Sequence, residues 1–232
     1  MRKTCNKYYF TYEGETEGWY LEHLSKLIND ENSATHRVSL NKTKSIAPLD
    51  YVKTKTLLQE TEIYQIVDFE GSEGEFSSRF KALLADMKLT PTINTNAHFN
   101  LAYNNLTFEL WMVLHKVDCN PPKTNRDDYL QDINRAYEEN FENPKSYKRE
   151  KNFKRCLKKI TLNDVKDAIC RAKAIMKARN FQHKPQQYNG YCYYEENPSL
   201  MIWQPIEKSC RIATCFTNSY THIFRQQTNM FH

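Results

Sequence analysis

Glycine is scarce in this chain of 232 residues, with only 5 in the whole sequence. Neither familiar glycine-rich phosphate loop is present, because the sequence contains no Gly-x-x-x-x-Gly-Lys and no Gly-x-Gly-x-x-Gly. We therefore do not expect this chain to hydrolyse ATP, and any ATPase activity would belong to a partner.

Long apolar runs and paired cysteines are also missing. No window approaches the roughly 18 consecutive apolar residues that a transmembrane helix needs, and no apolar segment follows the basic start of the chain. The 7 cysteines include no Cys-x-x-Cys pair, which argues against a disulfide framework and against a zinc site. We therefore expect a soluble cytoplasmic protein with reduced thiols and no association with a membrane.

Positive charge is concentrated in one part of the chain. The net charge is +5, and the segment 145–184 is rich in Lys and Arg but contains few acids. This segment predicts either a nucleic-acid-binding face or a helix with a solvated basic side. Tyr147 and Phe153 lie within it and are candidates for stacking on unpaired bases, as in RNA binding. The candidates for salt-sensitive contacts to backbone phosphates are Lys148, Arg149, Lys151 and Lys154.

The first half of the chain alternates short β-rich runs with amphipathic stretches. This alternation is typical of βα units around a mainly parallel sheet, so we predict an α/β fold with helices flanking the sheet. The helix expected at 107–116 is apolar on most sides, which predicts that it is buried almost all round. Strands are expected at 7–12, 36–40, 63–69 and 97–103, and helices at 16–28, 49–60, 76–87 and 107–116.

The second half of the chain has a different character. Long polar helices are expected there, with the basic tract between the first two, while the tail to His232 has no clear period. We therefore predict an α/β metal-binding core over 1–118 and a mostly helical extension over 119–232 that packs on it. The expected helices of the extension are 127–140, 162–179 and about 199–210.

Acidic residues directly follow two of the predicted strands. The run Glu13-Gly-Glu-Thr-Glu17 follows the first strand, and Asp68-Phe-Glu70 follows the third. The carboxyl ends of parallel strands meet at one edge of a sheet, where ligands bind in open α/β folds. Glu13, Asp68 and Glu70 therefore predict a site for Mg²⁺ or Mn²⁺, which prefer oxygen ligands and compensate clustered carboxylates. The alternative is that these acids only stabilise the starts of the helices that follow.

The apolar helix expected at 107–116 is flanked by two further polar residues. Asn105 precedes it and is expected either to cap it or to orient a group of the site. His115 lies at its end, where the helix dipole favours a histidine that has no catalytic role.

The order and spacing of the acids resemble the Toprim fold of topoisomerases, primases and OLD-type nucleases. More specifically, the runs 12–20, 68–70 and 104–115 are similar to the RloB-like (AbiLii) family. With Ala168-Ile-Cys-Arg-Ala-Lys173 and Glu196-Asn-Pro-Ser199, the resemblance covers roughly residues 7–205.

The resemblance implies a Toprim nuclease that acts as a toxic effector in abortive-infection defence against phage, beside an ABC-type or AAA-type ATPase. By motif, Glu13 matches the Toprim glutamate, Asp68 the first acid of Asp-x-Asp, and Glu109 the acid of the Phe-Glu-Leu-Trp run. Glu70 departs from the pattern, because Toprim proteins usually carry a second Asp there. The longer side chain of Glu70 would shift or weaken a second metal ion.

These residues predict hydrolysis of a phosphodiester bond in RNA, including tRNA, or in DNA. The metal would activate a water, either alone or with a second ion near Glu109, while Glu15 or Glu17 would act as a general base or outer-shell ligand. One alternative is a non-catalytic subunit that binds nucleic acid or a partner protein. Another is a Toprim enzyme that joins or transfers phosphodiesters. A homo-oligomer is compatible with each of these functions.

Overall fold

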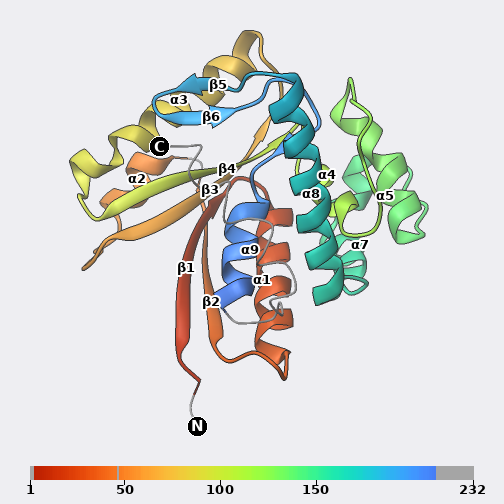
Figure 1. Ribbon diagram of the computed structural model, residues 1–232, viewed down its shortest axis with the longest axis horizontal. Helices are drawn as coiled ribbons and strands as arrows, with labels where there is room; N and C mark the ends of the chain where they lie inside the picture. The colour runs from red at the N-terminus through yellow and green to blue at the C-terminus, as the bar shows by residue number, and fades with distance from the viewer. Residues whose placement is uncertain (1–2, 46, 213–232) are drawn as a thin grey trace.

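The computed structural model of the protein describes residues 3–45 and 47–212. Its centre is a five-stranded sheet with strand order β2-β1-β3-β4-β7, in which only β7 runs antiparallel to its neighbour (Figure 1). The strands of this sheet are β1 (Cys5–Tyr12), β2 (Arg37–Lys44), β3 (Thr61–Phe69), β4 (Ala97–Asn105) and β7 (Ser199–Leu200). The predicted α/β fold with a mainly parallel sheet is confirmed.

Helices cover both faces of the sheet, and each face has its own hydrophobic core. Side chains alternate along a strand, so Ile66 of β3 faces one core and Val67 faces the other. The first core includes residues of α1 (Glu15–Asp30), α4 (Glu109–Leu114), α8 (Leu162–Gln182) and α9 (Trp203–Ile212). The second core includes residues of α2 (Pro48–Lys53), α3 (Gly74–Ile93) and the hairpin strand β6 (Tyr191–Tyr193), which pairs with β5 (Gln186–Tyr188).

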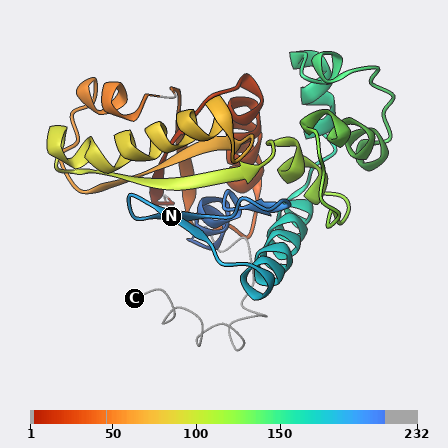
Figure 2. The ribbon, with the colours of Figure 1, turned by 90° about the horizontal axis from the view of Figure 1, so that it is seen from above.

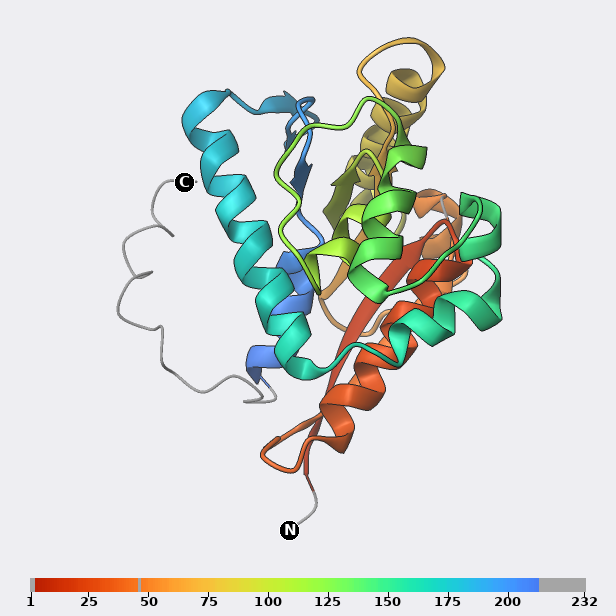
Figure 3. The same cartoon turned by 90° about the vertical axis from the view of Figure 1, so that its right-hand side faces the viewer.

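A group of short helices lies beyond the carboxyl end of the sheet. Figure 2 shows β4 running towards this group, which places the group beside the edge where the acids were predicted. Within this group, α5 contacts α4 and α7 contacts α1. The long helix α8 runs alongside α9 (Figure 3). The group consists of η1 (Arg126–Asp128), α5 (Tyr129–Tyr137), α6 (Pro144–Tyr147) and α7 (Glu150–Leu157).

The register of the sheet brings the carboxyl ends of β3 and β4 level. Asp68 lies opposite Asn104, and Phe69 lies opposite Asn105. β3 is buried over most of its length, which agrees with its continuous apolar run and with a central position in a parallel sheet. Any residue near the end of β3 is therefore close to the turn that leads from β4 into α4.

Two predicted helices have different bounds in the structure. The helix expected over 49–60 ends at Lys53, because the Thr54 hydroxyl donates to the carbonyl oxygen of Tyr51 at 2.8 Å and ends the turn. Leu58, which lies within the predicted range, is 91% exposed. The last helix begins at Trp203, because the two residues at the predicted start pair with β4 as β7. The tail from residue 213, for which no clear helical or strand period was predicted, lies outside the described residues.

The second half of the chain contributes to the central sheet as well as to the helices. β7 extends the sheet beyond β4, and side chains of α8 and α9 share one core with β1, β3 and α1. The predicted division at residue 118 stays a prediction. Within 3–45 and 47–212, no helix is both long enough and apolar enough to cross a membrane.

Candidate functional site

The acid-rich turn after β1 sends one of its glutamates into the protein. Glu13 and Glu15 are exposed, whereas Glu17 is buried and its Oε2 accepts a hydrogen bond from the Thr16 hydroxyl at 2.8 Å. Gly14 leaves the space for this arrangement, because a Cβ at that position would lie 2.7 Å from Glu17 Oε2. Glycine at this position therefore lets the Glu17 carboxylate lie in the interior at the end of the sheet.

A threonine hydroxyl joins the acid of β3 to the acid of α4. Thr107 Oγ1 lies 3.2 Å from Asp68 Oδ2 and is also hydrogen-bonded to Glu109 Oε2. Thr107 is fully buried and Glu109 is 6% exposed, so the bridge lies below the surface. A hydroxyl has a single proton, so Thr107 donates to only one of the two carboxylates at a time, and a second hydrogen bond forms only when the other carboxyl group is protonated and donates to Oγ1. The bridge fixes the two carboxylates relative to each other.

The nearest cation to this pair comes from the helical group beyond the sheet. Lys148 Nζ, directly after α6, lies 3.0 Å from Glu109 Oε1. Asp68 Oδ1, in contrast, is buried and has no hydrogen-bond partner within the described parts of the chain. The pair therefore holds one compensated carboxylate and one with an unsatisfied oxygen.

The three predicted metal ligands line one small cavity. Glu13, Asp68 and Glu70 all border a space of about 90 Å³ beside α3. Glu13 lies 3.8 Å from the guanidinium of Arg79, and Glu70 lies 2.6 Å from that of Arg126. The structure thus brings the predicted acids to one cavity but pairs the two outer ones with arginines.

Burial and neighbouring charges disfavour ionisation of Asp68 and Glu17. Burial raises the pKa of Asp68 well above its usual value, and the charges of Glu17 and Glu109 add to this effect. Burial also raises the pKa of Glu17, against a hydrogen bond from Thr16 that lowers it. Glu17, Asp68 and Glu109 are therefore close enough to repel one another, and we call these three residues the inner acid cluster. A cation among them would relieve the repulsion.

The donor chemistry of the inner acid cluster fits a hard divalent cation. Carboxylate oxygens are the ligands that Mg²⁺ prefers, and the unsatisfied Oδ1 of Asp68 offers one such ligand. Asn104, opposite Asp68 in the sheet, is fully buried, and neither of its amide atoms has a hydrogen-bond partner in the described chain. The present arrangement is not yet a ligand cage, because no three described His, Cys, Asp or Glu residues are grouped closely enough to hold a metal ion.

The predicted phosphate-binding residues have different surroundings. Lys148 is turned towards Glu109, as described above. Lys154 forms an ion pair with Glu150 at 2.6 Å, while Arg149 and Lys151 are exposed. Arg149 and Lys151 are therefore accessible to a ligand, and Lys148 lies at the acid cluster.

The suggested stacking residues are not available for that role. Tyr147 is 1% exposed and Phe153 is fully buried, and their rings pack against each other with centroids 5.4 Å apart. Phe153 also packs on Trp19 of α1. The prediction that these two rings stack on bases is wrong, because they form the core that attaches α6 and α7 to α1.

Asn105 holds the chain near β7. Its side-chain nitrogen donates to the carbonyl oxygens of Tyr194 and Glu195, at 3.1 and 3.0 Å. The N-cap residue of α4 is Phe108, and no side chain caps the helix there. Asn105 is therefore not the cap of α4 and instead ties the end of β4 to the segment that precedes β7.

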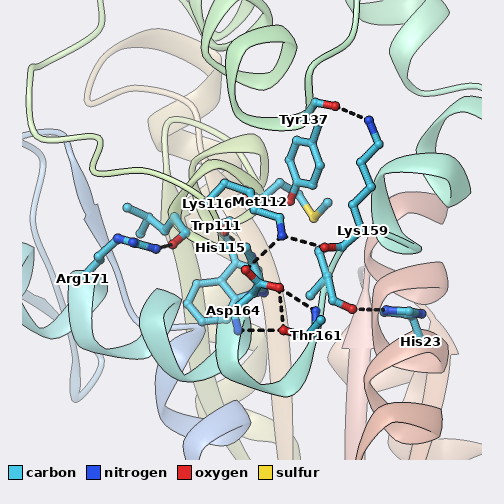
Figure 4. Close-up of polar contacts among 12 residues, drawn as sticks. His23, Trp111, Met112, His115, Lys116, Tyr137, Lys159, Thr161, Asp164 and Arg171 are labelled. Carbon is cyan, nitrogen blue, oxygen red and sulfur yellow. Dashed lines mark hydrogen bonds and ion pairs between the residues drawn. The ribbon is translucent and has the colours of Figure 1, made fainter.

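His115 occupies a buried pocket under α4. Its Nδ1 lies 2.9 Å from the carbonyl oxygen of Trp111, to which it donates (Figure 4). Its Nε2 therefore accepts from the Tyr20 hydroxyl at 3.1 Å. Burial lowers the pKa of His115 to about 4, which keeps the ring neutral. These contacts agree with a structural role for His115.

Several cations of the basic tract are used inside the protein. Figure 4 shows Arg171 donating to the carbonyl oxygen of Leu114 at 2.7 Å, and Lys116, which precedes the tract in sequence, contacting Asp164 at 2.9 Å. Lys159 donates to the carbonyl oxygen of Tyr137 in the same network. Cations at the carboxyl end of α4 satisfy carbonyl groups that the helix leaves free. Part of the tract thus attaches α4 to α5 and α8.

Four residues of the site were not anticipated in their observed roles. Thr107 bridges the acids, Arg79 and Arg126 pair with the outer acids, and Lys148 pairs with Glu109. A threonine two residues before an acid at a helix start was the only local signal for the bridge. The cations approach from α3, η1 and α6, and no spacing in the sequence indicates which acid each one meets.

The chain matches a family model over most of its length. The model is described as RloB-like protein, and it matches residues 8–208. No significant match was found among curated proteins or among solved structures. The matched range includes every residue of the inner acid cluster and the short helices beside it.

Proposed function

The chain belongs to the RloB-like protein family, and we propose that it is a metal-dependent nuclease of the Toprim type. The observation that carries this proposal is the buried bridge from Asp68 through Thr107 to Glu109 at the carboxyl end of the sheet. Buried acids that repel one another cost stability, so their presence at a ligand-binding edge favours a function over a purely structural role.

Asp68 and Glu109, which Thr107 joins, would hold the divalent cation directly, and Glu17 would act as an outer-shell ligand. When bound, Mg²⁺ or Mn²⁺ would supply charge to polarise the scissile phosphate and to lower the pKa of a water. Thr107 positions two of these carboxylates through its hydroxyl. Glu13 is exposed on the cavity that Asp68 also lines, so its carboxylate is placed to accept a proton from the attacking water.

The cations around the cluster suit a polyanionic substrate. Arg126 and Lys148 lie at the same edge as the acids, and Arg149 and Lys151 are exposed next to them along the chain. Such residues bind phosphates without reading sequence. We propose that the substrate is RNA, including tRNA, or DNA, and that the protein is a toxic effector in defence against phage. An ABC-type or AAA-type ATPase is the proposed partner, and assembly into a homo-oligomer is compatible with this function.

The test is cleavage by the purified chain with and without Mg²⁺ or Mn²⁺, on labelled tRNA, single-stranded RNA and duplex DNA. We expect Asp68→Asn and Glu109→Gln each to reduce the rate by about 100-fold or more, as losses of ligands to a catalytic metal do. Glu150→Gln is the matched control, because Glu150 is an exposed acid on α7. Equal cleavage by all four proteins would reject the proposed site.

A second candidate function is a non-catalytic nucleic-acid-binding or partner-binding subunit. It is favoured by the ion pairs that Glu13, Glu70 and Glu109 already make with Arg79, Arg126 and Lys148, which compensate these acids without a metal. The same experiment separates the two functions. A wild-type protein that binds the nucleic acids but cuts none of them, even with the proposed ATPase partner added, would support the binding subunit.

A further inference from the structure

A second cavity opens on the other side of Glu109, between η1 and α6. Its volume is about 280 Å³, close to the size of a small-ligand pocket. Three of the residues that line it are basic, one is a tyrosine and two are acidic. They are Arg126, Lys145, Lys148, Tyr147, Glu109 and Asp127.

The tyrosine in this cavity has a hydroxyl without a partner. Tyr147 is 1% exposed, and its hydroxyl is buried with no hydrogen bond to any of the described residues. The ring is held by Phe141 and Phe153, with centroids 5.6 and 5.4 Å away, so the hydroxyl cannot easily turn to another site. A buried donor without an acceptor among the described residues is able to donate to an oxygen of a ligand that enters the cavity.

The cations retain capacity for a ligand. Arg126 bonds Glu70 through Nη1, and its guanidinium has further N–H groups. Lys148 meets only Glu109 among the described acids, and Lys145 is exposed with no ion pair in that same set. Guanidinium and ammonium groups arranged around a hydroxyl donor match the oxygens of a phosphate.

We propose that this cavity is a subsite for a phosphate group of the nucleic-acid strand, adjacent to the phosphate that is cleaved. The inference rests on the proposed nuclease function and names the part of the substrate that the helical group binds. Tyr147 donates its hydroxyl proton to a phosphate oxygen, while Lys145, Lys148 and Arg126 neutralise the charge. Because Lys148 also pairs with Glu109, a phosphate that attracts Lys148 releases the Glu109 carboxylate for the metal ion.

Binding in the absence of metal tests the subsite. The probe is a single-stranded RNA octamer with a 3′ fluorescent label, titrated in EDTA and followed by anisotropy. We expect Tyr147→Phe and Lys145→Ala each to weaken binding by about 3-fold to 10-fold, as the loss of one hydrogen bond to a charged group does. Tyr147→Phe keeps the ring that packs in the core. Lys158→Ala, which removes an exposed lysine at the end of α7, is expected to change binding less than about 2-fold.

Competition identifies the group that is bound. Adenosine 5′-monophosphate is expected to displace the octamer, and adenosine is not. Octamers with and without a 5′-phosphate distinguish the source, because a preference for the first indicates a terminal phosphate and equal binding indicates an internal one. Either result supports the subsite. Equal competition by the nucleoside and the nucleotide, or unchanged binding by Tyr147→Phe, would overturn it. These binding experiments measure no cleavage, so their outcome tests the subsite, whereas the cleavage assay tests the nuclease proposal.

Discussion

The ammonium group of Lys148 lies 3.0 Å from Glu109 Oε1, at the point where the helical group meets the end of the sheet. Glu109 is the first residue of α4, and Lys148 comes directly after α6. The lysine therefore occupies the side of Glu109 from which a second positive charge would approach. A metal ion bound as proposed at Glu109 would therefore compete with this ammonium group for the same carboxylate.

Removal of the Lys148 charge is expected to strengthen metal binding. In Lys148→Met the Glu109 carboxylate loses its cation and binds Mn²⁺ more tightly, by about 3-fold to 10-fold for one partly exposed ion pair. Titration of Mn²⁺ followed by electron paramagnetic resonance measures the dissociation constant. Lys154→Met is the control, because Lys154 pairs with Glu150 away from the inner acid cluster. Weaker binding by Lys148→Met would show that the lysine does not compete with the metal.

Divalent metal is expected to stabilise the fold through Asp68. At a Mg²⁺ concentration ten times the dissociation constant, binding adds about 1.4 kcal/mol to the free energy of unfolding, which raises Tm by about 3–6 °C for a chain of this size. Asp68→Asn should lose this increase, because its amide lacks the anionic oxygen. Thermal melts with Mg²⁺ and with EDTA measure both proteins. A rise in Tm of the same size in Asp68→Asn would place the metal elsewhere.

His115 is expected to make stability depend on pH on the acidic side. Its pKa is about 4 in the folded protein and about 6.5 when unfolded, so the unfolded state takes up a proton first as the pH falls. The contribution is complete above about pH 6.5 and is lost on the way to pH 4, by up to about 3 kcal/mol. Urea unfolding of wild type and His115→Gln between pH 7 and pH 4 measures how steeply the free energy of unfolding of each protein falls with pH. Parallel curves for the two proteins would contradict this assignment.

Asn105→Ala is expected to loosen the segment before β7. The substitution leaves the carbonyl oxygens of Tyr194 and Glu195 without their donor and should lower the free energy of unfolding by about 2–3 kcal/mol. Relative to wild type, amide hydrogen exchange in Asn105→Ala should become faster in 194–200 and stay unchanged in α3. Asn152→Ala is a useful comparison, because the amide of Asn152 donates to a single carbonyl, that of Ser146. A smaller loss of stability in Asn105→Ala than in Asn152→Ala would contradict the role given to Asn105.

The exposed cations next to α7 are expected to set the salt dependence of nucleic-acid binding. The double substitution Arg149→Ala and Lys151→Ala should lower the slope of log K against log salt concentration by about 1–2. Lys88→Ala, an exposed lysine on α3, is the control and should leave the slope unchanged. Anisotropy titrations at several salt concentrations measure the slopes. An equal effect of Lys88→Ala would show that binding is not localised to the helical group.

The parallel sheet could be predicted because its signals are local. The strand over 63–69 and the apolar helix after Asn105 depend on runs of neighbouring residues, and both are present in the structure. β7 could not be predicted, because two residues pair with β4 only after the whole helical half has returned to the sheet. The helix predicted over 49–60 was too long, because the chain leaves the helix at Lys53 and Leu58 is exposed.

The site was predictable in its acids and unpredictable in its cations. The positions after β1 and β3 follow from sheet topology, so Glu13 and Asp68 could be expected at one edge. The approach of Lys148 to Glu109 depends on the packing of Tyr147 and Phe153 against α1, which no periodicity encodes. Charge along the sequence therefore showed that cations are available, but not which of them reach the acids.

The antiparallel strand β7 gives the protein a fixed order of assembly. During synthesis β3 and β4 leave the ribosome early, but the partner strand of β4 and the carbonyl groups held by Asn105 come after residue 193. Tyr147 and Lys148, which border the acids, also follow the sheet strands that carry Asp68. The edge that bears the acids is thus complete only after residues 194–200 have been synthesised, so a nascent chain that stops before them does not yet carry the finished site.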